Sequence, residues 1–138
     1  MLSESFRRWC EGLHERLFAA AEADMGTAGE TFLRDVVGGE GWEALPEPLR
    51  AMFAANGPAI VAEERGGLLD VTVEQLAAIA VPTLAVAGRA SRREFAEVME
   101  IVAAAIPGAK LVWVDGDHII DPGDPAVLRF VDEALALR

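Results

Sequence analysis

His118 is one of only two histidines in the chain, and it closely follows a short apolar run at residues 111–114. Asp115, Gly116 and Asp117 separate the run from the histidine, and these residue types are common in loops. An imidazole with a usual pKa of about 6.5 exchanges protons near neutral pH, so histidine is the side chain most often used in general acid–base catalysis. The pattern therefore indicates a candidate general base at the end of a strand.

A general base of this kind activates a nucleophile such as a serine hydroxyl, and the chain offers few of them. Its serines are Ser3, Ser5 and Ser91, and no GxSxG motif is present. Ser91 stands three residues before Glu94, which is the spacing of a helix capping box, so we expect the Ser91 hydroxyl to cap a helix. The sequence thus holds a candidate base without a candidate nucleophile.

Other residues that can bind metals or cofactors lack the required partners. Cys10 and His14 lie four apart on one expected helix, but two ligands do not make a zinc site and the chain has no further cysteine. The four aspartates within 115–124 lack the glycine and glutamate that a calcium loop needs. A loose GxGxxA pattern at 39–44 is followed by prolines that would break the helix of a dinucleotide site. We therefore expect no metal and no cofactor.

Composition limits the class of partner. The 138 residues are 52% hydrophobic and carry a net charge of -11, which repels nucleic acid and anionic membranes. The apolar run at 77–87 is interrupted by Pro82 and is too short to span a bilayer. Charged residues near the N-terminus predict no secretory signal, and the single cysteine is compatible with a reducing compartment. We expect a cytoplasmic protein that binds neither nucleic acid nor membranes.

The first 80 residues show helical periodicity and no convincing strand. A first helix with an apolar face that includes Phe6 and Leu13 is expected to end near Gly26, and Thr27 with Glu30 predicts a capped second helix that Gly38 stops. Three shorter helices are expected after it: one around 49–56, one from Pro58 to Gly66, and one capped by Thr72 with Gln75.

The pattern changes at Val81. Apolar runs at 83–87 and 111–114 predict buried strands, and the amphipathic stretch between them, ended by Pro107 and Gly108, predicts a helix. Asp124 and Pro125 are typical of the cap and first position of a last helix. Strand, helix, strand, helix is a right-handed unit with two parallel strands, so we predict an α/β fold with a helical segment at 1–80 and this unit at 81–138.

Two parallel strands are few for an independent sheet. Parallel strands occur buried on both faces of larger sheets, and an isolated pair leaves unpaired backbone groups along both outer edges. The hypothesis that follows is that either a second copy of the chain or a separate chain supplies the missing strands.

Taken together, these segments resemble the C-terminal half of an α/β hydrolase. The sequence VPTLAVAG at 81–88 is similar to that family's penultimate core strand, and IPGAKLVWV at 106–114 to its last passage from helix to strand. GDH at 116–118 with DP at 124–125 is similar to the family's histidine loop and final helix. The resemblance implies a truncated α/β-hydrolase-like fold in which residues 1–80 form a helical lid.

The resemblance implies that His118 is the catalytic general base, which activates a serine and later protonates the leaving group. The position where the family usually has its acid is Ser91 here, and some members place that acid before the lid, in a region this chain lacks. The nucleophile and the oxyanion donors also belong to that region. The resemblance therefore implies a catalytic half that another polypeptide completes.

Two functional hypotheses follow. In the first, the chain contributes the lid and His118 to hydrolysis or transfer of an ester or thioester, with a small apolar acyl-type ligand and a partner chain that bears the nucleophile. In the second, the chain is a catalytically inactive homodimeric binding or structural module derived from such an enzyme. The chain is an enzyme only under the first hypothesis.

Overall fold

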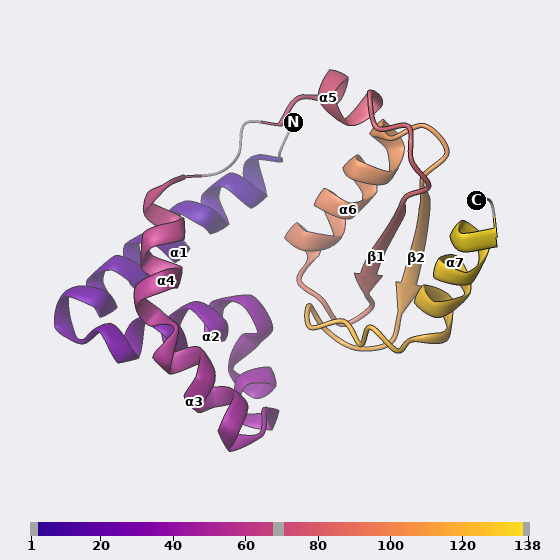
Figure 1. Ribbon diagram of the computed structural model, residues 1–138. Coiled ribbons are helices and arrows are strands. Elements are labelled where there is room, and N and C mark those ends of the chain that lie inside the picture. Colours follow the sequence, from indigo (N-terminus) through magenta and orange to yellow (C-terminus); the bar gives the residue numbers. More distant parts are fainter. Residues whose placement is uncertain (1–2, 68–70, 137–138) are drawn as a thin grey trace. The chain divides into compact units, whose positions relative to one another are not determined.

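Two compact units make up the computed structural model, which describes residues 3–67 and 71–136 (Figure 1). One unit is Glu4–Asp70, and the other combines Val71–Arg138 with Met1–Ser3. The described elements are α1 (Glu4–Ala23), α2 (Met25–Ala44), α3 (Glu47–Ala55), α4 (Gly57–Arg65), α5 (Val73–Ala77), β1 (Leu84–Gly88), α6 (Arg93–Ala105), β2 (Lys110–Val114) and α7 (Pro125–Ala136). The described part of the chain is thus mostly helical, with one small parallel sheet.

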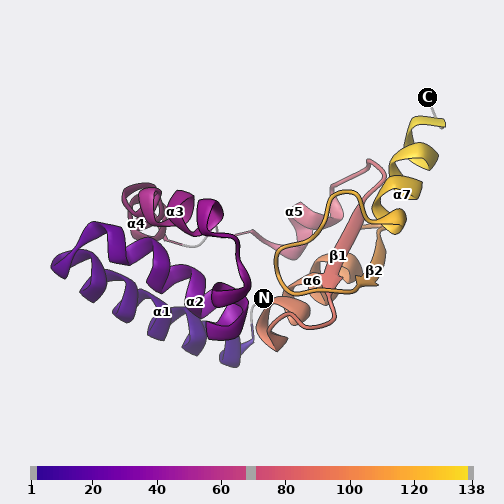
Figure 2. The same cartoon turned by 90° about the horizontal axis from the view of Figure 1, so that it is seen from below.

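The helical unit packs four helices around a small apolar core. Apolar side chains spaced three or four apart on α1, among them Phe6 and Leu13, are buried, as the sequence predicts. The central cluster takes one residue from each of three helices: Leu17, Ala28 and Val61. Figure 2 shows α3 and α4 lying across the same side of the α1–α2 pair. Packing against the α1–α2 pair stabilises α3 and α4, which are only 9 residues long each and would not persist in isolation.

The start of α2 differs from the prediction. The N-cap is Asp24, whose carboxylate accepts hydrogen bonds from the backbone N–H and from the hydroxyl of Thr27. The prediction that Thr27 caps this helix is therefore wrong: Thr27 lies within the first turn and donates to the true cap. A carboxylate at the N-cap accepts the amide hydrogen bond and also favours the positive end of the helix dipole.

The predicted stop at Gly38 is a kink. Gly38 has φ 82° and ψ 163°, a conformation that is essentially confined to glycine, and the helix resumes after it through Ala44. The expectation that Gly38 ends the second helix is therefore wrong, and Trp42 is buried in the resumed helix.

The second unit contains the predicted pair of parallel strands. Leu84 of β1 is in register with Lys110 of β2, and Gly88 is in register with Val114 at the other end. The helix α6 lies between the strands in sequence and packs against both, while α7 packs against β1. Within residues 71–136 no third strand pairs with this sheet, so the two outer edges carry no strand partner.

Two of the predicted caps in this unit are confirmed and one is wrong. Thr72 and Gln75 form the full capping box of α5, and the carboxylate of Asp124 accepts the backbone N–H of Ala126 at the start of α7. The expected box of Ser91 with Glu94 does not form, because α6 begins at Arg93 and Arg92 occupies the N-cap, where its side chain makes no capping hydrogen bond. The helix starts later than that box requires.

Candidate functional site

The chain segments that leave the two strands are hydrogen-bonded to each other. After β1, the N–H of Arg89 donates to the carbonyl of Val114, and the N–H of Ala90 donates to the carbonyl of Gly116, both at 2.9 Å. The Arg89 guanidinium also donates to the carbonyl of Trp113 and lies 3.5 Å from the Asp115 carboxylate. These contacts fix the start of the loop that carries His118 at the carboxyl end of the sheet, the edge where α/β proteins bind ligands.

Gly88 determines how closely this loop approaches β1. A Cβ at Gly88 would overlap the carbonyl oxygen of Asp117 and come within 2.7 Å of the carbonyl oxygen of Gly116. Only a residue without a side chain therefore allows the loop to pass over the end of β1. Asp117, the residue before His118, therefore packs directly against the backbone of Gly88, where the sequence predicts the end of the strand.

His118 lies in the loop after β2, and its ring stacks on Phe95 of α6. The two ring centroids are 4.0 Å apart and the ring planes are inclined by 22°. The residue as a whole remains exposed, so one face of the imidazole is covered while the rest of the side chain is accessible to solvent. The structure therefore orients the predicted base by aromatic packing from the neighbouring helix.

The protonation of His118 follows from this environment. Desolvation lowers the pKa of His118 below its usual value near 6.5, because burial disfavours the charged imidazolium. The carboxylate of Asp117 acts in the opposite direction and is the smaller effect. At neutral pH the imidazole is consequently neutral, which is the form that accepts a proton.

Two aspartates of the loop accept hydrogen bonds from backbone N–H groups. The carboxylate of Asp117 accepts the N–H of Ile119 at 2.8 Å, and the carboxylate of Asp121 accepts the N–H of Gly123 at 2.8 Å. These are Asx turns, which mimic a backbone turn and stabilise the loop. In the described residues no group of three or more His, Cys, Asp or Glu side chains is arranged to hold a metal ion.

The second histidine belongs to the helical unit. His14 Nε2 lies 2.7 Å from a carboxylate oxygen of Glu64 on α4, and its ring also stacks on Phe18. Cys10, one turn earlier on α1, is buried, and burial raises the pKa of its thiol, with smaller contributions from Glu64 and Glu11. A protonated, buried thiol is a poor nucleophile and metal ligand, so this pair is a packing feature.

Phe95 and Glu64 are the partners that the sequence analysis missed. The helical periodicity of α6 places Phe95 on an apolar face but does not show which loop it meets. No local pattern links Glu64 to His14, since the two lie on different helices. Ser91 does not cap α6 as predicted. Its backbone N–H donates to the carbonyl of Gly88, in the turn that follows β1.

No membrane-spanning helix and no similar protein point to a function for the described part of the chain. Among residues 3–67 and 71–136, no helix is both long enough and apolar enough to cross a bilayer. No family model matches the chain, and no curated protein or solved structure is significantly similar to it.

Proposed function

We propose that this chain contributes the general base His118 to an active site of the α/β-hydrolase type, whose nucleophilic serine is carried by a partner polypeptide. The reaction is the hydrolysis or transfer of an ester or thioester. The chain is then an enzyme component, and its helical unit keeps the role of lid that the resemblance implies. The observation that carries the proposal is the solvent-accessible imidazole at the carboxyl end of two parallel strands, stacked on the ring of Phe95.

The loop geometry supports this role for His118. Two backbone hydrogen bonds, the close contact at Gly88 and the ring of Phe95 restrict where the imidazole can lie. A catalytic group must be held in place before reaction, because a displaced base transfers protons poorly. An inert loop histidine requires none of these restraints.

The sheet supports the need for a partner. The described sheet has two strands, and the outer edge of each offers backbone N–H and C=O groups for pairing. In a larger parallel sheet these edges are covered by further strands. A partner that adds strands here would bring its own loops to the same carboxyl edge as His118, where a GxSxG serine is expected to lie.

The experiment that tests the proposal is to isolate the protein with its bound partners and to measure hydrolysis of activated esters. His118→Ala is expected to lower kcat by a factor on the order of 10²–10⁴, the usual contribution of a general base. A fluorophosphonate probe, which reacts with activated serines, is expected to label the partner in the wild-type complex and to label it much more slowly in the variant.

His14→Ala is the matched control, since it removes the other histidine from the helical unit and leaves the sheet loop unchanged. This variant is expected to keep both ester hydrolysis and probe labelling. The proposal fails if the isolated complex contains no probe-reactive serine, or if His118→Ala hydrolyses esters as fast as the wild type.

A second candidate function, an inactive homodimeric module, is favoured by one surface of α7. Leu128, Val131 and Leu135 follow one another at helical spacing and are 51%, 43% and 57% exposed. Such a stripe of apolar side chains is typical of a helix that packs against another protein surface. A second copy of the chain would bury the stripe symmetrically.

Sedimentation at roughly tens of micromolar separates this alternative from the first, because dimerisation depends on protomer concentration. A dimer that Val131→Glu converts to a monomer would support the homodimeric module. Arg129→Gln changes the net charge by the same amount on the opposite side of α7 and is the control. A wild-type monomer would contradict the homodimer and leave the two-chain enzyme as the remaining proposal.

A further inference from the structure

The kink in α2 divides that helix into two parts of different intrinsic stability. The part after Gly38 comprises only residues 39–44, and it contains the further glycines Gly39 and Gly41. Each glycine costs a helix about 1 kcal/mol relative to alanine, and isolated helices of this length do not persist in water. Contacts outside the segment must therefore hold it in its helical position.

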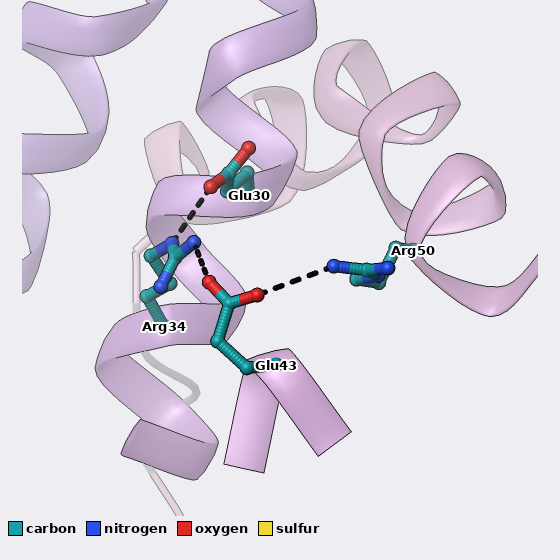
Figure 3. Close-up of polar contacts among 4 residues, drawn as sticks. All are labelled: Glu30, Arg34, Glu43 and Arg50. Atoms are coloured by element: carbon teal, nitrogen blue, oxygen red, sulfur yellow. Dashed lines mark hydrogen bonds and ion pairs between the residues drawn. The ribbon is translucent and has the colours of Figure 1, made fainter. Parts of the chain in front are cut away.

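Arg34, which lies before the kink, contacts the segment after it (Figure 3). Its guanidinium donates to Glu30 at 2.7 Å on its own side of the kink and to Glu43 at 2.5 Å on the other side. The same guanidinium lies 5.7 Å from the ring centroid of Trp42. Arg34 thus ties the helix before the kink to the segment after it.

The remaining contacts extend this arrangement to α3. The other carboxylate oxygen of Glu43 accepts a hydrogen bond from Arg50 at 3.3 Å (Figure 3). Trp42 is 4% exposed, yet it does not belong to the central cluster of Leu17, Ala28 and Val61. Trp42 is thus a buried side chain on the segment that follows the kink.

We propose that residues 39–44 form a flap that is hinged at Gly38 and closed by Arg34. Gly38 suits a hinge because a Cβ built on it would meet nothing within 4 Å, and because glycine crosses between backbone conformations at low cost. The side chains of Arg34 and Glu43 are 39% and 59% exposed, so salt and water reach the ion pair that closes the flap. Opening would uncover Trp42. This inference is independent of His118 and of the proposed function.

Hydrogen exchange of the full chain, followed by mass spectrometry, tests the flap. Raising the salt concentration from about 0.1 M to about 1 M screens the ion pairs, so amides of 39–46 are expected to exchange several-fold faster while those of 25–37 do not change. Arg34→Gln removes both carboxylate contacts and the ring contact, and is expected to accelerate exchange of 39–46 by about tenfold in low salt.

Glu43→Gln is a second variant, since it breaks the ion pair between Arg34 and Glu43 at the more exposed of the two side chains. It leaves Trp42 in place. It is expected to accelerate exchange of 39–46 by about threefold. Glu4→Gln is the control, because it breaks an exposed ion pair with Arg8 on α1 and is expected to leave 39–46 unchanged. The proposal is overturned if high salt, Arg34→Gln and Glu43→Gln all leave amide exchange in 39–46 unchanged. It is also overturned if exchange in 25–37 accelerates equally.

Discussion

The imidazole of His118 and the ring of Phe95 lie nearly parallel, with centroids 4.0 Å apart. Two opposing effects arise from this contact. A protonated imidazole would gain a cation–π attraction of about 0.5–1 kcal/mol, whereas covering the ring removes water from the charged form. Burial lowers the pKa of His118 more than the Asp117 carboxylate raises it. Phe95 therefore positions the ring of His118 and contributes to the burial that disfavours its charged form.

Replacing Phe95 is expected to change the pKa of His118 in a way that depends on the size of the new side chain. Phe95→Ala exposes the ring to water, so the pKa should rise toward about 6.5. Phe95→Leu keeps an apolar cover but removes the aromatic face, so the pKa should stay low. An NMR titration of the His118 ring protons measures both. Equal pKa values in the two variants would contradict the role given to Phe95.

Asp117→Asn is expected to shift the same pKa in the other direction. The carboxylate of Asp117 raises the pKa of His118 by favouring the imidazolium, and an amide removes that charge. The side-chain oxygen of asparagine can still accept the N–H of Ile119, so the Asx turn is retained. The pKa of His118 should therefore fall further below the wild-type value. A pKa that does not fall would mean that the charge of Asp117 does not favour the imidazolium of His118.

The stability of the protein in acid is expected to report the same effect. Because the folded-state pKa of His118 is lowered, the unfolded chain binds the proton more readily. The contribution of neutral His118 is fully present above about pH 6.5 and is lost as the pH falls through the lowered folded-state pKa. His118→Asn should reduce the loss of unfolding free energy in that window, measured by urea denaturation. An unchanged pH dependence would argue against burial of the neutral ring.

Local sequence patterns predicted much of the chain where the responsible contact is local. The capping box of Thr72 and Gln75 and the cap of Asp124 both depend on residues two or three apart, and both are confirmed. The caps predicted at Thr27 and Ser91 from the same kind of pattern are wrong. A nearby residue can compete for the cap, as Asp24 does, and helix starts shift with packing that a short motif does not contain.

Non-local contacts explain what the sequence did not show. Gly38 was read as a helix stop, but burial of Trp42 and the contacts of Arg34 continue the helix beyond it. The position of His118 after the second strand followed from the apolar run, whereas its orientation depends on Phe95 from another element. The lid, the hydrolase relationship and the ester-type substrate remain predictions.

Gly88→Ala is expected to disturb the His118 loop. The new methyl group would overlap the carbonyl oxygen of Asp117, and a backbone oxygen cannot turn aside as a side chain can. We expect a loss of about 1–3 kcal/mol in unfolding free energy, together with altered NMR shifts of His118. Gly123→Ala is the control in the same loop, because the nearest atoms to its methyl group would belong to the side chain of Asp121 and not to the backbone. Similar losses in the two variants would contradict the close contact at Gly88.

The packing of the helical unit leads to a last prediction, at Gly29 in α2. A Cβ at this position would overlap the carbonyl oxygen of Phe53 in α3, and one at Gly57 would overlap the carbonyl oxygen of Met25. Alanine is the better helix former by about 1 kcal/mol, so propensity alone predicts that Gly29→Ala stabilises the protein. The backbone overlap outweighs this gain, because α2 and α3 would have to move apart.

We therefore expect Gly29→Ala to lower the unfolding free energy by about 1–3 kcal/mol in denaturant titrations. Gly12→Ala on α1 is the matched control, since its methyl group would meet only the end of the flexible Arg16 side chain. That variant should be neutral or stabilising, as helix propensity predicts. If both substitutions stabilise the protein, α2 and α3 are not in the close backbone contact that a glycine at residue 29 permits.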